Sequence, residues 1–387
     1  MPRTKRRPTS PGRSKQEPRR VRYGVVGLGW FAQTAILPAF AHAKKNSELA
    51  ALFSESPKKL EALGRKYRVP RERRFSTDDF EEALSASGVD AVYIATPNDL
   101  HREFAVRAAR SNVHVLCEKP MAVTERDCEE MIAAAVKSGV KLMIAYRLHF
   151  ERANLEAVEI VNSGKLGEPR IYASVFCNEV KDRDNIRLHP IEKGGGTLYD
   201  IGIYCLNAAR YLFRGEPVEV VALSANGGNP RFSETDEMTS AILKFPGERL
   251  ATFTSSFGAA SAHFYDVYGT KGRLRVEPAF EFAEGMRHEL KIGERKRTKQ
   301  FAARDQVAPE ILSFSECILE NREPEPSGRE GLADVRVIRA LYESARTGRP
   351  VRLAPFEKRR RPSLEQEVRR PPNREPELVR VGKPSQR

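Results

Sequence analysis

The chain has 387 residues, of which 40% are apolar and 30% charged, and its formal net charge is +14. This length is enough for two domains with a sizeable core, and the absence of any apolar run of about 18 residues excludes a membrane-spanning helix. Its five cysteines are scattered, which excludes a disulfide framework and a zinc motif and is typical of reduced thiols in a cytoplasmic protein.

The positive charge is concentrated at the two ends of the chain. Residues 1–20 carry +7 and residues 357–387 carry +5, which leaves +2 for residues 21–356. Both ends are rich in proline and lack aromatic residues, so they cannot bury enough apolar surface to fold alone. We therefore predict two disordered basic tails, 1–20 and 357–387. Loose contact with polyanions such as nucleic acid is the alternative use of these charges.

Apolar strands alternate with helical stretches in the first part of the chain. Strands are expected at 21–27, 48–54, 90–97, 112–120 and 141–147, with helices at 30–43, 57–67, 101–111 and 125–139 between them. The strands are apolar throughout, which indicates a parallel sheet that is covered on both faces. The fold class is therefore α/β, with a doubly wound Rossmann domain for a dinucleotide over residues 21–146.

Residues 147–356 show a different pattern and predict a second, α+β domain. Strands are expected at 169–180, 218–227, 238–245, 249–257 and 263–278, and helices near 151–163, 306–320 and 328–346. The strands alternate apolar and polar residues, as in an antiparallel sheet with one covered face. An open sheet face favours pairing with a second copy, so we expect a homo-oligomer, a dimer or tetramer.

The segment GVVGLGWFA joins the first strand to the first helix. Gly27 permits a tight turn, Gly29 lets the backbone approach a pyrophosphate, and the small Ala32 occupies the third position of the dinucleotide fingerprint. The helix that follows stabilises the phosphate charge at its N-terminus. We expect the cofactor to contact the two glycines and the adjacent Trp30 and Phe31.

The end of the second strand is where the adenosine ribose is recognised. An acidic residue at this position binds the 2′-hydroxyl of NAD. This chain has Ser54 there, followed by Lys58 and Lys59, which suit the 2′-phosphate of NADP. Glu55 is the competing signal for NAD, and the two lysines are equally compatible with a solvated helix surface. The sequence favours NADP, with NAD as the open alternative.

A second glycine-rich segment, GGGTLYDIGIY, occupies residues 194–204. Three consecutive glycines allow the backbone to approach another group closely. Asp200 and Tyr204 are four residues apart in the helix that follows, so they share one helix face. A carboxylate beside a phenol next to such a segment indicates a site of proton transfer.

The motifs GLGWFA, ATPNDLH, EKPM and GGGTLYDIGIY follow one another in this order. With them, residues 21–353 resemble the Gfo/Idh/MocA oxidoreductases, and within that family the glucose–fructose oxidoreductase and sugar dehydrogenase branch. The resemblance implies transfer of a hydride between a hydroxyl carbon of a sugar or polyol and a nicotinamide. It also leaves open an aldose–ketose exchange with retained NADP, and a cofactor-binding regulator without catalysis.

The resemblance also implies roles for particular residues. Glu118 and Lys119 of the EKP segment end a strand over the nicotinamide, and the lysine touches the ribose and the substrate hydroxyl. Asp200 and Tyr204 complete a catalytic set with Lys119, which argues against an inactive regulator. The remaining residues that line the cofactor or its cleft in such proteins are Thr96, Pro97, Asn98, His101, Tyr146 and Arg147.

A tyrosine in this set would move a proton. A free phenol ionises near pH 10, too high for a base at neutral pH, and an adjacent cation such as Lys119 favours the phenolate. Asp200 would orient the sugar or relay the proton. No carboxylate or thiol cluster joins His101 and His149 in the sequence, so we predict no metal site.

Overall fold

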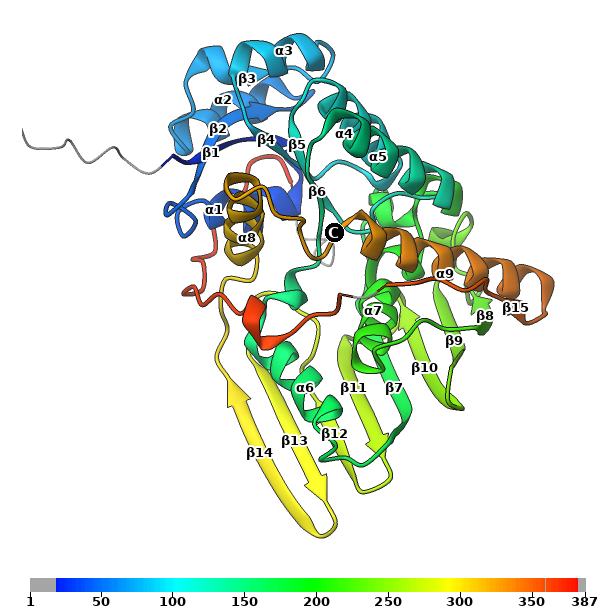
Figure 1. Cartoon of the computed structure of the whole chain (residues 1–387). Coiled ribbons are helices and arrows are strands. Elements are labelled where there is room, and N and C mark those ends of the chain that lie inside the picture. Colours follow the sequence, from blue (N-terminus) through cyan, green and yellow to red (C-terminus); the bar gives the residue numbers. More distant parts are fainter. Residues whose placement is uncertain (1–18, 359, 382–387) are drawn as a thin grey trace, which may run out of the picture.

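The computed structural model describes residues 19–358 and 360–381. The chain forms two domains, each built on one β-sheet (Figure 1). The predicted α/β fold, a Rossmann domain followed by an α+β domain with a large open sheet, is confirmed. The predicted N-terminal tail lies outside the described residues up to residue 18.

The first sheet has six parallel strands in the order β3-β2-β1-β4-β5-β6. This is the doubly wound order, in which the chain turns outward on both sides of β1. The two-residue strand β3 is the one that the sequence did not predict. The strands are β1 (Val21–Val26), β2 (Ser47–Phe53), β3 (Arg74–Phe75), β4 (Ala91–Ile94), β5 (His114–Glu118) and β6 (Leu142–Ala145).

Helices cover both faces of this sheet, as the apolar strands require. One face packs against α3, α4 and α5, through side chains such as Phe80 and Phe104. The other packs against a π-helix, η1, that continues into α1, and against α2 and α8. These elements are η1 (Ala32–Ile36), α1 (Leu37–Ala39), α2 (Pro57–Lys66), α3 (Phe80–Ser87), α4 (His101–Arg110), α5 (Glu125–Ser138) and α8 (Ala308–Leu319).

Helix α8 shows that the first domain is completed by a later part of the chain. We predicted residues 147–356 as the second domain, but α8 lies on the first sheet. The Tyr23 hydroxyl bonds to the Ser315 hydroxyl at 2.8 Å, and Ile311 belongs to the same apolar core as β1. Helix α1 has only three residues, so α8 supplies the remaining cover that a parallel sheet needs.

The second sheet has nine strands in the order β14-β13-β12-β11-β7-β10-β9-β8-β15. All neighbours are antiparallel except β7 and β10. Its strands are β7 (Pro169–Cys177), β8 (Glu219–Ala225), β9 (Met238–Phe245), β10 (Arg249–Ser256), β11 (Ala262–Gly269), β12 (Gly272–Val276), β13 (Met286–Ile292), β14 (Arg295–Phe301) and β15 (Val351–Arg352).

The hairpin β13–β14 was missed because its strands carry little apolar signal. Strand β14 reads RKRTKQF and is exposed along almost its whole length. Charged residues are typical of edge strands, where they oppose pairing with another chain. The segment expected as one strand at 263–278 is two strands, β11 and β12, joined by a turn at GTKG.

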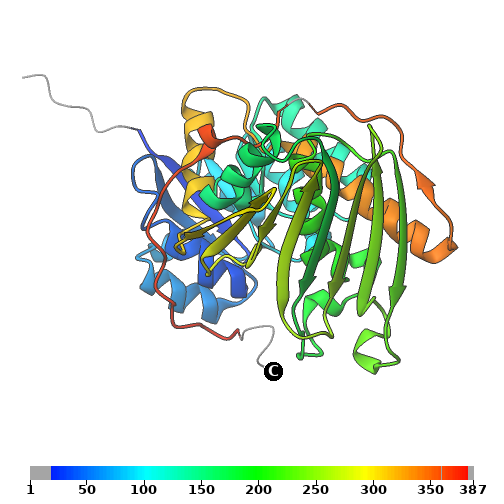
Figure 2. The same cartoon turned by 90° about the horizontal axis from the view of Figure 1, so that it is seen from below.

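One face of the second sheet is covered and the other is open. Helices α6, α7 and α9 pack on the inner face, and Figure 2 shows the opposite face in front of them. Strand β9 alternates accordingly, since Leu243 and Phe245 are buried whereas Met238 and Ile242 are exposed. The helices are α6 (Arg152–Asn162), α7 (Ile203–Leu212) and α9 (Gly328–Thr347).

Short helical turns lie at the junctions between these elements. The π-helix η7 (Leu198–Gly202) runs directly into α7, and π-helical turns are frequent at functional sites. The 3₁₀ turns are η2 (Arg71–Arg73), η3 (Asn98–Leu100), η4 (Arg147–His149), η5 (Ile186–Leu188), η6 (Ile191–Lys193), η8 (Pro230–Phe232) and η9 (Leu364–Gln366).

Residues 360–381, which we call the strap, differ from the predicted disordered tail. They run in extended form along the outside of both domains (Figure 2). Arg361 pairs with Glu216 at 2.6 Å, and Glu367 pairs with Arg152 at 2.7 Å. The composition argument considered only apolar burial. It did not anticipate that charges of the tail would bind carboxylates and guanidinium groups of the body.

The five cysteines are buried free thiols, as expected of a chain without a disulfide framework. Each lies in a different element: β5, α5, β7, α7 and α8. Within the part of the chain that the structure describes, no helix is long and apolar enough to cross a membrane.

A buried ionic cluster joins α7 to α9 behind the inner face of the second sheet. The fully buried Arg210 guanidinium contacts Glu216 at 2.6 Å, Glu330 at 2.7 Å and Asp334 at 2.5 Å. The Tyr146 hydroxyl donates to Asp334 at 2.6 Å. Three carboxylates around one guanidinium require that cation, because a buried charge without a partner is strongly unfavourable.

We expect Arg210→Leu to lower the free energy of unfolding by about 3–5 kcal/mol, since it leaves buried carboxylates unpaired. Urea unfolding followed by circular dichroism measures the change. Arg352→Leu is the matched control, because that side chain is 90% exposed in its pair with Glu219, and it should cost under about 1 kcal/mol. Equal effects of the two substitutions would contradict the structural role of the cluster.

Candidate active site

The turn after β1 has the shape that the dinucleotide fingerprint requires. Gly27 has a φ of +90°, and a Cβ there would lie 2.5 Å from the Ala95 carbonyl oxygen. At Gly29, no described heavy atom lies within 4 Å of where a Cβ would be. The first glycine is therefore closed in by protein, whereas the second faces open space at the start of the helix. A pyrophosphate fits that space.

Aromatic and polar groups flank this turn. Trp30 and Phe31 pack edge-on against Phe282, with ring centroids 5.9 Å and 5.5 Å apart. The Trp30 indole nitrogen and the Thr96 hydroxyl are buried without a hydrogen-bond partner among the described residues. Buried polar atoms normally have partners. Two such atoms beside an open turn fit a site that binds a polar cofactor.

The Ser54–Lys59 segment forms the start of α2. The Ser54 hydroxyl accepts a hydrogen bond from the Ser56 amide, and the Ser56 hydroxyl caps the helix at the Lys59 amide. Lys58 and Glu55 are exposed, whereas Lys59 is half-buried and has no ion pair within the described residues. Burial lowers the pKa of Lys59. A half-buried cation without a carboxylate partner suits a phosphate.

The predicted ATPN–H residues divide into two groups. Thr96, Pro97 and Asn98 are partly exposed after β4, and the Asn98 amide donates to the Gly194 carbonyl at 2.7 Å. His101 is buried instead, with its ring nitrogens 2.8 Å and 3.0 Å from the carbonyls of Pro120 and Thr96. His101 therefore supports this loop from behind and does not line the cleft.

The three glycines make close approaches, but to protein groups. A Cβ at Gly194 would lie 2.6 Å from Asn98, one at Gly195 would lie 1.8 Å from the His189 carbonyl, and one at Gly196 would lie 2.3 Å from a tyrosine hydroxyl of α9. The sequence predicted that this segment approaches another group closely. In the structure its glycines let the second domain pack against the first domain and against its own core.

The predicted catalytic residues Lys119 and Asp200 meet across the two domains. Lys119 follows β5, and its amine donates to the Asp200 backbone carbonyl at 2.7 Å and lies 3.5 Å from the carboxylate. Arg187 of η5 holds the other carboxylate oxygen at 2.5 Å. Burial would raise the pKa of Asp200, but the charges of Arg187 and Lys119 outweigh it and hold that pKa below its usual value.

The ring of Tyr204 lies between two cations. The Lys119 amine is 4.7 Å from the ring centroid and the Arg147 guanidinium carbon is 4.8 Å from it. Arg147 is buried and is fixed by the side chain of Gln306 and the carbonyl of Phe280. The structure thus brings Lys119, Asp200 and Tyr204 together, and it places Arg147 against the tyrosine.

Two carboxyl groups, the partly buried Glu118 and the buried Glu310, lie behind these cations. The Tyr93 hydroxyl is 2.8 Å from Glu118 and 3.5 Å from Glu310. Burial raises the pKa of Glu118 to about 7, although Lys119 and Arg147 oppose this shift. Burial and the charge of Glu118 raise the pKa of Glu310 as well. Two carboxyl groups in such proximity do not both ionise readily, so they hold a proton at neutral pH.

Comparison with known proteins identifies the chain at this point. The family described as "Oxidoreductase family, NAD-binding Rossmann fold" matches residues 21–146, and the "GFO/IDH/MocA C-terminal domain" matches residues 154–275. The chain belongs to the Gfo/Idh/MocA oxidoreductase family. The resemblance stated from its motifs, and the dinucleotide-binding role of its first domain, are confirmed.

Several relatives span nearly the whole of this Gfo/Idh/MocA chain. D-xylose 1-dehydrogenase [NADP(+)] of Haloarcula marismortui is 32% identical over 337 residues, covering 86% of this chain and 93% of that protein. The structure of aldose–aldose oxidoreductase from Caulobacter crescentus is 41% identical with a TM-score of 0.82, covering 87% and 100%. A 3-ketoreductase from Actinomadura kijaniata in complex with NADP is 25% identical, with a TM-score of 0.75, covering 84% and 98%.

Sequence reasoning missed the residues that hold the predicted ones. Arg187 lies in a loop without a recognisable motif, and its role depends on where the chain places Asp200. Gln306 and Glu310 lie at the start of α8, which was not expected beside the cleft. The sequence did contain a helix-start signal there, the acidic Asp305 shortly before the helix. In the structure its side chain accepts hydrogen bonds from the Val307 and Ala308 amides.

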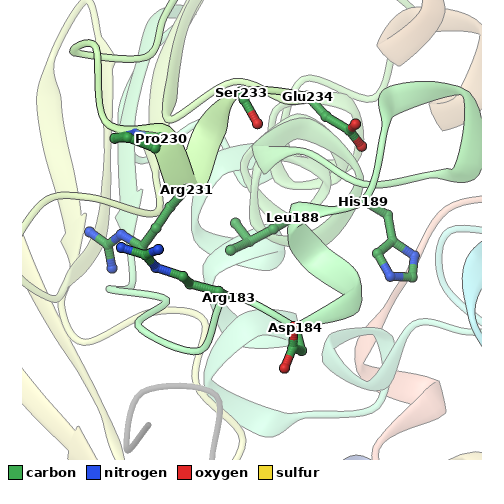
Figure 3. A pocket seen from close by; sticks show the side chains of 8 residues that line it. All are labelled: Arg183, Asp184, Leu188, His189, Pro230, Arg231, Ser233 and Glu234. Carbon is green, nitrogen blue, oxygen red and sulfur yellow. The ribbon is translucent and has the colours of Figure 1, made fainter.

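A hollow of about 380 Å³ lies between the loop that contains η5 and the loop that contains η8 (Figure 3). It combines cationic, anionic and hydroxyl groups from two loops of the second domain, which is a lining suited to polar molecules. The residues that line it are Arg183, Asp184, Leu188, His189, Pro230, Arg231, Ser233 and Glu234.

We expect Gly27→Ala to weaken NADPH binding at least about 10-fold, because the new methyl group would collide with the Ala95 carbonyl and displace the turn. Titration of NADPH fluorescence measures the affinity. Gly139→Ala is the control: its φ is +66° and no described atom crowds it. It should cost about 1 kcal/mol of stability and leave affinity unchanged. Normal NADPH affinity in Gly27→Ala would exclude this turn as the phosphate site.

Proposed function

We propose that this protein oxidises an aldose at a hydroxyl-bearing carbon, with NADP as the hydride acceptor and Tyr204 as the proton acceptor. The observation that carries the proposal is the position of the Tyr204 ring between the cations of Lys119 and Arg147, beside Asp200. This set lies at the end of β5, on the edge of the parallel sheet where cofactors bind in doubly wound folds.

The residues of the first domain fit a dinucleotide. Gly27 and Gly29 would hold the pyrophosphate, Trp30 and Thr96 offer unpartnered polar atoms beside it, and Lys59 would face the ribose phosphate. The nicotinamide, when bound, supplies the acceptor for a hydride. The protein itself binds the sugar, orients its carbon and removes the proton of its hydroxyl.

In its phenolate form the Tyr204 oxygen can accept a proton, and the Lys119 and Arg147 cations lie against the same ring. The sugar hydroxyl loses its proton to the tyrosine oxygen while the hydrogen on the same carbon leaves as a hydride. The sugar thereby loses one proton and one hydride, and its hydroxyl-bearing carbon becomes a carbonyl carbon.

Asp200 is less suited to be the base. Its two carboxylate oxygens face Arg187 and Lys119, and those charges hold its pKa low, so it is a weak proton acceptor at neutral pH. We assign it the role of fixing the Lys119 amine. The substrate then contacts an amine whose position is set from the second domain.

Two relatives support the substrate class and suggest two forms of the reaction. The Haloarcula protein is named an NADP-dependent dehydrogenase of D-xylose, and the Caulobacter protein an aldose–aldose oxidoreductase. An ordinary dehydrogenase releases NADPH after each turnover. An exchange enzyme keeps it and reduces a second sugar, and the 41% identity to the Caulobacter protein favours testing this second form.

A panel of aldoses and polyols assayed with NADP and with NAD tests the function, with absorbance of the reduced cofactor as the readout. We expect reduced cofactor to accumulate with an aldose and NADP. If purified protein already carries nucleotide, and a second sugar consumes the hydride without free NADPH, the exchange reaction is the correct one. No reduction with any sugar in either assay would contradict both forms.

The open face of the second sheet supports a further part of the proposal, that the protein is a homo-oligomer. Large apolar side chains are exposed along neighbouring strands of this face, and contiguous exposed apolar surface commonly marks an interface. A C2 dimer would cover the same face of both copies. The exposed side chains are Ile171, Leu223, Met238, Ile242, Leu250 and Tyr268.

We expect Lys59→Ala to weaken NADP binding by about 10- to 150-fold and to leave NAD nearly unchanged, because a charge-assisted phosphate contact contributes roughly 1.5–3 kcal/mol. Lys58→Ala is the matched control, since the neighbouring lysine is exposed and should affect both cofactors little. A wild-type enzyme that uses NAD better than NADP would reject this assignment and transfer the ribose role to Glu55.

We expect Tyr204→Phe to reduce turnover by about 10²- to 10⁴-fold, the usual contribution of a general base, with NADPH affinity retained. Lys119→Ala should act on the same step, so the double variant should be little worse than either single variant. Tyr211→Phe is the control and should turn over within a few-fold of wild type. Tyr211 lies on the same helix, α7, and lines a small cavity together with Tyr204 and Lys119.

Asp200→Asn separates the two candidate bases under the same conditions. If Tyr204 is the base, Asp200→Asn should retain measurable turnover with a shifted pH dependence. The reason is that a neutral amide no longer compensates the positive charges of Lys119 and Arg187. Near-normal turnover in Tyr204→Phe together with complete loss in Asp200→Asn would assign the base to the carboxylate.

A further inference from the structure

The chain leading into the strap is fixed to the second domain by buried ion pairs. Lys358, which is 4% exposed, contacts Glu325 at 2.6 Å and Glu330 at 2.7 Å. Arg361 is equally buried against Glu216. These cations join the same carboxylates that surround the buried guanidinium of α7. The strap therefore starts from a fixed point.

The strap then crosses to the first domain, on the face that carries η1 and α2 (Figure 2). The Arg370 guanidinium donates to the His42 carbonyl at 3.0 Å, and the Lys66 amine donates to the Glu377 carbonyl at 2.8 Å. The segment thus spans both domains and approaches the helix that follows the dinucleotide turn.

The strap ends its described course on Gln33, a buried residue of that helix with 1% exposure. The Gln33 side-chain oxygen accepts from the Val379 amide at 2.7 Å, and its nitrogen donates to the Val379 carbonyl at 3.0 Å. The same nitrogen donates to the Leu28 carbonyl at 3.0 Å. Gln33 therefore connects the strap to the residue between the two glycines of the turn.

The geometry of one peptide group gives this connection a function. The Leu28–Gly29 peptide is planar and trans, so its carbonyl and its N–H point in opposite directions. Fixing the Leu28 carbonyl on Gln33 also fixes the direction of the Gly29 N–H, at the glycine where a Cβ would meet no described atom within 4 Å. That N–H is then oriented before an anionic group of the cofactor arrives.

We propose that Gln33 is a positioning residue for the dinucleotide, and that the Val379 backbone of the strap holds its amide in place. The strap thus acts on cofactor affinity through Gln33 and Leu28, without touching the substrate. This inference rests on dinucleotide binding by the first domain and is independent of which sugar the enzyme oxidises.

The test compares two substitutions at one position. Val379→Pro removes the N–H that Gln33 accepts from, whereas Val379→Ala keeps both backbone groups and shortens only the side chain. NADPH and NADH binding are measured on the full-length protein by cofactor fluorescence, and NADPH release by stopped flow. We expect Val379→Pro and Gln33→Ala each to weaken both nucleotides about 3- to 10-fold, the range of one lost hydrogen bond, through faster release.

The double variant Gln33→Ala/Val379→Pro should bind no more weakly than Gln33→Ala, because both changes break the same connection. Val379→Ala should bind both nucleotides like wild type. Unchanged nucleotide affinity in folded Gln33→Ala and Val379→Pro would overturn the proposal. Additive losses would overturn it too, because they would place the two residues on separate paths.

These measurements need no sugar, so an incorrect substrate would not affect them. The ratio of the effects on NADPH and NADH is equally informative. Gln33 acts on the turn that holds the pyrophosphate, which both nucleotides share, so we expect that ratio to be near one. A loss confined to NADPH would instead place the effect at the ribose phosphate and would contradict the role of Gln33.

Discussion

The contact between the Lys119 amine and Asp200 holds the active site together. Lys119 belongs to the first domain and Asp200 to the second, so the 2.7 Å hydrogen bond from the amine to the Asp200 backbone carbonyl joins the two domains at the proposed active site. The amine is only 12% exposed, and a desolvated cation needs a fixed counter-charge. Asp200 provides it because Arg187 holds its other oxygen. A second interdomain bond, from Asn98, depends on a glycine that no larger residue could replace.

The charges around this contact are arranged in two layers. Lys119 and Arg147 face the Tyr204 ring, and behind them Glu118 and Glu310 share a buried environment with the hydroxyl of a tyrosine. Because burial raises the pKa of both carboxyl groups, they do not fully cancel the two cations at neutral pH. The cleft therefore keeps a positive field where a phenolate would form, and the field weakens as the pH rises through about 7 and Glu118 ionises.

The sequence predicted those features that depend on local pattern. Five of the six strands of the first sheet and the glycine turn follow from apolar runs and from spacing. What it did not predict depends on long-range partners. His101 carries a polar ring but is used by two backbone carbonyls, and Arg187 acquires its role only when the chain returns to Lys119. The strap is mostly polar, and its order comes from charged and polar partners far away in the sequence together with Val368 and Val379, which pack on the core of the first domain.

The cofactor domain is not an independent unit, although its sequence pattern ends near residue 146. The face of its sheet that carries the dinucleotide helix is covered by α8 and by the strap, which come from the last fifth of the chain. Residues 21–146 alone would lack the helix that packs on strands β1, β2 and β5 of that face, where Tyr23 contacts Ile311 and Ser315. The chain must therefore complete the substrate domain before the cofactor turn obtains its final support. The support of the glycine turn and the packing of the second domain on the first therefore both depend on late parts of the chain.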